Sequence, residues 1–231
     1  MRLVLIFESN WFCEIVYNRT FSEICNKMLK YGEEKLIDII VPEVCIGEVA
    51  KQVENETAHL KNISDHLKNL DIFKLETDLP NEAKKGELKI PGLINEIEDG
   101  INRIKDEYFK LIKSMEGRYK PWPIPQNVDK RVERLRDDYG LTFTFVDSLI
   151  AATVLDIIDN ISGEKPTPIL IYLEKDDAFR KPQGASFKEE LEQKNVRYYH
   201  NPESCLEAIE MEIRKEYINI LITLISNRIY R

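Results

Sequence analysis

The sequence predicts a three-layer α/β fold built on a parallel sheet. Three short apolar runs rich in branched side chains lie at residues 3–7, 36–41 and 169–173. Such runs are typical of strands that are buried on both faces of a sheet. Segments with helical spacing of apolar residues separate the runs, and this alternation favours parallel pairing of the strands. We therefore expect a parallel sheet that is covered by helices on both faces.

In the first half of the chain, the spacing of apolar residues predicts the helices and strands, and glycine and proline mark where they begin or end. Apolar residues recur every three or four positions in the predicted helices and run together in the strands. Gly32 marks a helix end, and Pro42 suits a first helical position. In order, we expect a strand at 3–7, a helix at 11–31, a strand at 36–41, a helix from 42 that continues with breaks toward 70, and a loop or a short edge element at 74–91.

The second half contains one helix that is apolar almost all round, at residues 145–155, which predicts burial inside the domain. Around it we expect a helix at 94–112, an extended proline-rich loop at 121–125, a charged helix at 128–138, strands at 169–173 and 196–199, a helix at 186–194 and a long helix from 202 onward. The expected organisation is a single domain over residues 1–231, with a helical insertion at about 57–140.

The composition favours a cytoplasmic protein that does not enter membranes. The 231 residues are 43% hydrophobic, enough for a sizeable core, and the formal net charge is -8. This negative net charge argues against a protein whose whole surface is basic and binds nucleic acid, although it is compatible with a local basic groove. The four cysteines are scattered without metal-ligand spacing, which predicts reduced, buried thiols. The three histidines also lack ligand spacing.

Four acidic residues belong to elements whose ends meet at one edge of the predicted sheet. Glu8 follows the first strand, Glu48 lies in the helix after the second, Asp147 opens the buried helix, and Asp176 follows the strand at 169–173. Parallel strands bring these positions to the carboxyl edge, where such sheets bind ligands. Clustered carboxylates repel one another and favour a cation, and Mg²⁺ or Mn²⁺ prefers oxygen ligands. The predicted chemistry is metal-assisted phosphodiester hydrolysis.

Each of these side chains also has a structural interpretation that stays open. Ser9 and Asn10 can cap the helix that follows them. Glu48 can be a solvated flank of an amphipathic helix. Asp147 near a helix N-terminus is favourable to the helix dipole without any metal. Asp176 follows a strand, where aspartate is an ordinary turn residue.

Four short blocks in this order resemble the PIN-domain ribonucleases, and their longer PIN-like members more than the compact toxins. The blocks lie at residues 7–10, 41–48, 146–152 and 174–179. The resemblance implies an endoribonuclease that cuts RNA, single-stranded RNA being the expected substrate. It also implies one or two Mg²⁺ or Mn²⁺ ions held by Glu8, Glu48, Asp147 and Asp176. Ser9 and Asn10 would be supporting residues in such a site.

The sequence departs from the family pattern at two places. Glu8 stands where the family has aspartate, and its additional methylene moves the carboxylate oxygens by roughly an ångström. Glu174 and Lys175 replace the usual threonine and asparagine, so that Asp177 can exchange roles with Asp176. These departures motivate a competing hypothesis, a catalytically degenerate PIN-like module that binds RNA or a partner protein.

Two further segments bear on partners. Arg180, just after the last acidic block, is placed to meet phosphate if the site binds RNA. Residues 217–225 are strongly apolar, which predicts a packing or dimerisation helix and a homodimer. An inhibitory or complex-forming partner protein is a further expectation.

Overall fold

The computed structural model describes residues 2–8, 11, 19–69, 90–115, 117–139, 144–174 and 182–229. The elements in chain order are β1 (Leu3–Phe7), α2 (Arg19–Glu33), β2 (Asp38–Pro42), α3 (Glu43–Asn69), α6 (Ile90–Met115), β3 (Lys120–Trp122), α7 (Val128–Tyr139), α8 (Phe145–Ile161), β4 (Ile169–Leu173), α9 (Pro182–Gln193), β5 (Val196–Tyr199) and α10 (Pro202–Ile229). The strands expected at 3–7, 169–173 and 196–199 are confirmed with the same bounds.

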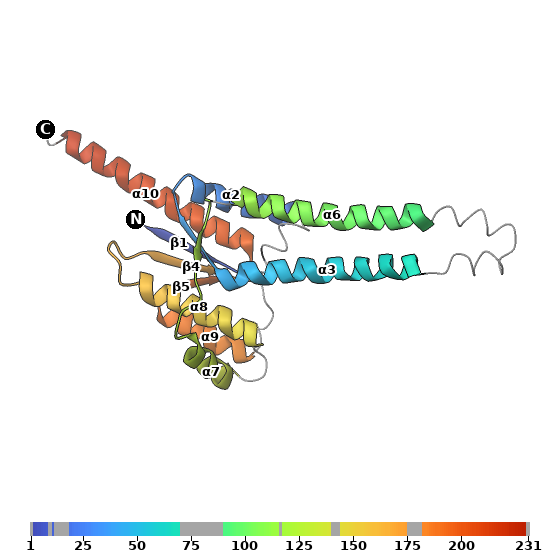
Figure 1. Cartoon of the computed structure of the whole chain (residues 1–231). Coiled ribbons are helices and arrows are strands. Elements are labelled where there is room, and N and C mark those ends of the chain that lie inside the picture. Colours follow the sequence, from blue (N-terminus) through green and yellow to red (C-terminus); the bar gives the residue numbers. More distant parts are fainter. Residues whose placement is uncertain are drawn as a thin grey trace, which may run out of the picture. The chain divides into compact units, whose positions relative to one another are not determined.

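The five strands form one parallel sheet in the order β3-β2-β1-β4-β5. Figure 1 shows α2 and α10 on one face of the sheet and α8 and α9 on the other, so the predicted three-layer α/β fold is confirmed. The chain builds the sheet outward from β1 in one direction through β2 and β3, and then in the other through β4 and β5. The topological switch point therefore lies between β1 and β4.

The core lies between the sheet and its flanking helices. All five residues of β1 are buried, and α8 buries most of its length. The prediction that the cysteines are reduced and buried is confirmed for the three in the described ranges, Cys25, Cys45 and Cys205. Cys13 lies outside those ranges.

The chain divides into two compact units. Unit 1 comprises residues 1–49 and 115–231 and contains the sheet, while unit 2 comprises residues 50–114. The insertion expected at about 57–140 covers most of unit 2 and extends into β3 and α7, which belong to unit 1.

Unit 2 is an antiparallel helical hairpin formed by the later part of α3 and by α6 (Figure 1). Within unit 2, each helix has a row of buried or half-buried residues that are spaced alternately by three and four positions, as in the seam of a coiled coil. The rows are Val53, Thr57, Leu60, Ser64 and Leu67 on α3, and Ile94, Ile97, Ile101, Ile104 and Tyr108 on α6, where Glu98 and Gly100 are also half-buried. Glu98 of α6 accepts hydrogen bonds from Ser64 (3.4 Å) and from the ammonium of Lys68.

Gly32 does not end the helix expected at 11–31. Helix α2 continues to Glu33, and Lys35 then adopts the left-handed conformation with φ 58°. A Cβ at Gly32 would lie 2.7 Å from the carbonyl oxygen of Arg118 and 2.8 Å from Cδ1 of Ile39. Glycine is therefore required here by close packing between segments that are distant in sequence. Residues 12–18 of the expected helix lie outside the described ranges.

Two expectations about prolines are wrong. Pro42 ends β2, where it pairs with Trp122, and α3 begins only at Glu43. Pro121 and Trp122, expected in a loop, belong to the edge strand β3. An edge strand tolerates proline because its outer N–H groups have no neighbouring strand to pair with. The helix after β2 is also continuous to Asn69, without the expected breaks.

Candidate functional site

The carboxyl edge of the sheet at the switch point carries two buried carboxylates. Phe7 of β1 pairs in register with Leu173 of β4, so Glu8 and Glu174 are the next residues along these neighbouring strands. Glu8 is 2% exposed and Glu174 is 0% exposed. The pairing between β4 and β5 extends to Glu174, because the backbone N–H of Glu174 donates to the carbonyl oxygen of Tyr199 (3.0 Å). The expected position of Glu8 at this edge is thus what the structure shows.

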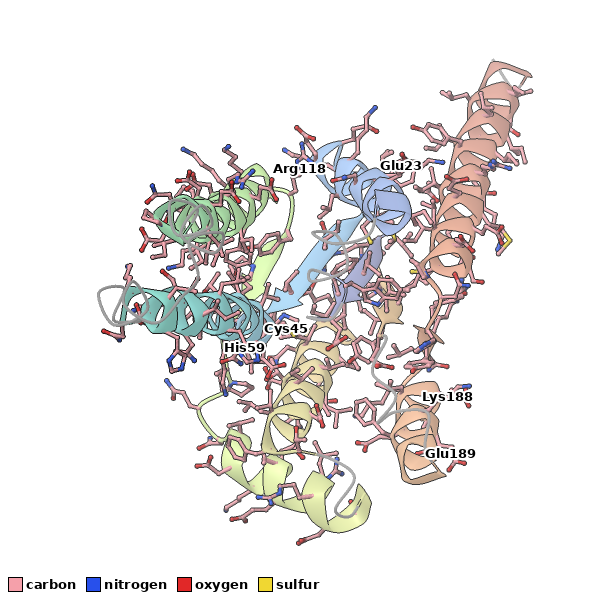
Figure 2. The ribbon with its side chains drawn as sticks, turned by 90° about the vertical axis from the view of Figure 1, so that its right-hand side faces the viewer. Glu23, Cys45, His59, Arg118, Lys188 and Glu189 are labelled. Atoms are coloured by element: carbon pink, nitrogen blue, oxygen red, sulfur yellow. The ribbon has the colours of Figure 1, made fainter. Side chains whose placement is uncertain are left out.

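Strand β5 holds the side chain of Glu174 in place. The hydroxyl of Tyr198 donates a hydrogen bond to Oε2 of Glu174. Nδ1 of His200 lies 4.0 Å from the same oxygen. Lys188 of α9, labelled in Figure 2, places its ammonium 5.7 Å from the centre of the Tyr198 ring. One carboxylate oxygen of Glu174 is therefore oriented by Tyr198 of β5, and His200, the residue directly after β5, lies near it.

Tyr172 of β4 lies on the same sheet face as Glu174, because residues two apart in a strand point the same way. It is fully buried, and its hydroxyl has no hydrogen-bond partner in the part of the chain that the structure describes. Burial raises the pKa of Tyr172 well above its ordinary value, and the negative charges of Glu8 and Glu174 raise it further. The hydroxyl of Tyr172 therefore lies close enough to both carboxylates for electrostatic interaction with them.

Helix α3 enters the same neighbourhood at its first turn. Cys45, labelled in Figure 2, is buried and also contributes to the raised pKa of Tyr172. Glu48 lies three residues further along α3 and is half-buried. Because residues three apart in a helix are surface neighbours, Glu48 occupies the turn next to Cys45.

Asp147 has a clear structural role at the start of α8. Its Oδ2 accepts from the backbone N–H of Thr144 (2.8 Å), and its own N–H donates to Oγ1 of Thr144 (3.2 Å). These two bonds form a capping box. Asp147 therefore has the structural role, at the N-terminus of a helix, that the sequence left open as an alternative to metal binding. Its role as a metal ligand stays a prediction.

Five of the expected site residues, Ser9, Asn10, Asp176, Asp177 and Arg180, lie outside the described ranges. Among the residues that are described, no group of three or more His, Cys, Asp or Glu side chains is arranged to hold a metal ion. Glu8 and Glu174 are nevertheless oxygen donors of the kind that Mg²⁺ and Mn²⁺ prefer. Two buried carboxylates on adjacent strands also raise each other's energy unless a cation or a proton compensates them.

In the sequence, Glu174 stands out only as a departure from a family pattern and His200 receives no role, because the histidines lack ligand spacing. A usable signal was present, because an acid that directly follows a wholly apolar strand must be buried or lie at the strand end. Its neighbours Tyr198 and His200 could not be found in this way, since they come from a strand that is distant in sequence.

The fold and the site together define an α/β protein with a parallel sheet, whose acids lie outside the carboxyl ends of the strands at the switch point. A family model described as PIN domain matches residues 5–172, and the chain belongs to the PIN domain family. PIN domains are generally nucleases, and the family generally uses divalent metal ions. No curated protein and no solved structure matches the chain. No helix in the described ranges combines the length and hydropathy needed to cross a lipid bilayer.

Proposed function

We propose that this protein is a divalent-metal-dependent endoribonuclease that acts on single-stranded RNA. The observation that carries the proposal is the buried carboxylate of Glu8, which follows β1 beside the switch point of a PIN domain. Mg²⁺ and Mn²⁺ prefer carboxylate oxygens as ligands, and the carboxyl ends of parallel strands at a switch point are where such folds bind ligands.

In this proposal Glu8, Glu48, Asp147 and Asp176 hold Mg²⁺ or Mn²⁺, and Asp177 can take the place of Asp176. When bound, the ion would act as a Lewis acid toward the phosphate and would activate a water. Ser9 and Asn10 support the ligands by hydrogen bonding. Arg180 meets the phosphate of the substrate by charge.

The test is cleavage of labelled single-stranded RNA and DNA with Mn²⁺, Mg²⁺ or EDTA. Asp147→Asn should lower the rate at least about 100-fold, the loss expected when a metal ligand is removed. Thr144→Ala is the matched control, because it removes the hydrogen bond from the Asp147 N–H to Oγ1 of Thr144, the other half of the capping box, but leaves the carboxylate. It should cost only about 1 kcal/mol of stability and keep the activity. Equal activity of the two variants would show that Asp147 is a cap alone.

The second candidate function is a catalytically degenerate PIN-like module that binds RNA or a partner protein, and Glu8 in place of aspartate favours it. Glu8→Asp separates the two. A gain in cleavage supports an impaired or specialised enzyme, whereas continued inertness of a folded variant supports a binding module. An inert wild-type chain that also shows no calorimetric signal with Mn²⁺ would contradict the nuclease proposal.

A further inference from the structure

We propose that Glu174 is a further ligand of the divalent ion, paired with Glu8, and that Tyr198 is the residue that positions it. The inference rests on the proposed function, since it concerns the same metal site. It adds a residue that stands where the family has threonine.

The first step is the alignment of the strands. Ile6, Tyr172 and Tyr198 form one row across β1, β4 and β5. Residues two positions further along these strands form a second row on the same sheet face. The members of that second row are Glu8, Glu174 and His200. Two carboxylates are therefore neighbours at the switch point, and no loop conformation is needed to bring them together.

The second step concerns burial and orientation. Glu174 is 0% exposed, so its carboxylate has no direct access to bulk water. Tyr198 and His200 approach Oε2 from β5, on the side opposite to β1 and Glu8. Metal-ligating carboxylates are commonly held by such a second hydrogen bond. The carboxylate is thus pre-oriented on a rigid strand end, as a ligand must be.

The third step is the hydroxyl of Tyr172, an independent observation. It is fully buried, and no residue in the described ranges hydrogen-bonds to it. A buried polar group of this kind calls for a specific partner. The waters of a hydrated ion held by Glu8 and Glu174 would supply hydrogen-bond partners for this oxygen.

The competing explanation is that Glu174 is a structural acid which stays protonated and serves only its hydrogen bonds to β5. Glutamine has nearly the same shape and keeps a carbonyl oxygen that accepts from Tyr198. A purely structural role therefore predicts that Glu174→Gln folds normally and leaves metal affinity unchanged.

The experiment is calorimetric titration of Mn²⁺ into the full chain, with Mn²⁺ electron paramagnetic resonance as a second readout. Glu174→Gln should weaken Mn²⁺ binding at least about 10- to 100-fold, and Tyr198→Phe by roughly 10-fold. Glu190→Gln is the matched control. This acid of α9 pairs with Arg134, at 3.0 Å, and should leave the affinity for Mn²⁺ unchanged.

The outcomes separate this inference from the proposed function. Wild-type affinity in a folded Glu174→Gln variant overturns the inference, while Mn²⁺ binding by the wild-type chain leaves the proposed nuclease standing. Absence of Mn²⁺ binding in the wild-type chain overturns both. If Glu174→Gln does not fold, Tyr198→Phe decides, because it keeps the carboxylate: weaker Mn²⁺ binding supports the inference and unchanged binding overturns it.

Discussion

The carboxyl edge of the sheet and the end of α10 depart from ordinary burial in opposite directions. At the sheet edge, Glu8 and Glu174 are almost inaccessible to solvent although they are carboxylic acids. At the end of α10, seven large apolar side chains are each 48–57% exposed. They are Tyr217, Ile218, Ile220, Leu221, Ile222, Leu224 and Ile225.

Single exposed apolar residues are common in proteins and need no explanation. A buried acid and a cluster of exposed apolar residues are uncommon, and each therefore calls for a physical reason. Burial of an acid is costly unless hydrogen bonds, a positive charge or a proton compensate its carboxylate. The apolar cluster is unfavourable until another surface covers it. The ion that we propose under the nuclease hypothesis would compensate the first region, and the second region is the basis of a proposal about a protein partner.

Within α10 the contrast is between two parts of a single helix. The first part buries Cys205, Ala208 and Ile209 and is anchored by charge. Glu210 pairs with Lys27 (2.5 Å) of α2. The second part has no charged residue from position 217 to 227.

We propose that a second copy of this chain covers residues 217–225. A standard interface removes roughly 800 Å² from each partner, and seven half-exposed large side chains offer an area of that order. Leu221→Lys should convert a dimer to a monomer in light scattering, because desolvating an unpaired cation costs several kcal/mol in each chain.

The matched control for that substitution is Asn219→Lys, since Asn219 lies on the opposite side of the helix, about 160° away at 100° per residue. This variant should keep the dimer. A wild-type chain that scatters as a monomer would rule out the second copy and favour a different partner protein.

The next prediction compares how alanine substitutions in the two parts of α10 change the free energy of unfolding. Ile209→Ala should lower the free energy of unfolding by about 2–5 kcal/mol, because Ile209 is 0% exposed and a cavity would remain. Ile225→Ala, at 57% exposure, should change it by less than about 0.5 kcal/mol when the chain is monomeric. Denaturant unfolding measures both, and equal losses would show that residue 225 is packed within its own chain.

The smallest effect concerns the charges that hold the first part of α10 to β5. Glu212 accepts from Lys215 (2.8 Å) and Arg197 (2.9 Å), and these hydrogen bonds hold its pKa below the ordinary value of 4.5. Because the pKa of Glu212 is lower in the folded state than in the unfolded state, ionised Glu212 stabilises the fold at pH values above its unfolded-state pKa. This stabilisation is lost as the pH falls through the folded-state pKa.

Glu212→Gln should therefore flatten the decline in unfolding free energy below pH 4.5. Its cost at neutral pH should be less than about 1 kcal/mol, because both cationic partners are largely exposed. Thermal unfolding across the acid range measures the slope, and Glu207→Gln, an exposed acid on the same helix, is the control.

Much of the fold could be predicted from the sequence, because strand and helix patterns are local. The apolar runs at 3–7 and 169–173 are strands, and the nearly all-apolar segment from 145 is the buried helix α8. The role of Gly32 could not be predicted, since the atoms that exclude a Cβ there belong to Ile39 and Arg118. Asp147 shows the same limit, because one carboxylate can serve as a cap and as a ligand.

By itself, the sequence determined most of the strands and helices, although not the edge strand β3, and it placed an acid directly after the first strand. Only the tertiary structure decided that Phe7, Leu173 and Tyr199, the residues directly before Glu8, Glu174 and His200, are paired across the sheet and that Tyr198 donates to Glu174. The physical reason is that periodicity reports burial along one segment. The order and register of neighbouring strands depend instead on packing and hydrogen bonds between segments far apart in the chain.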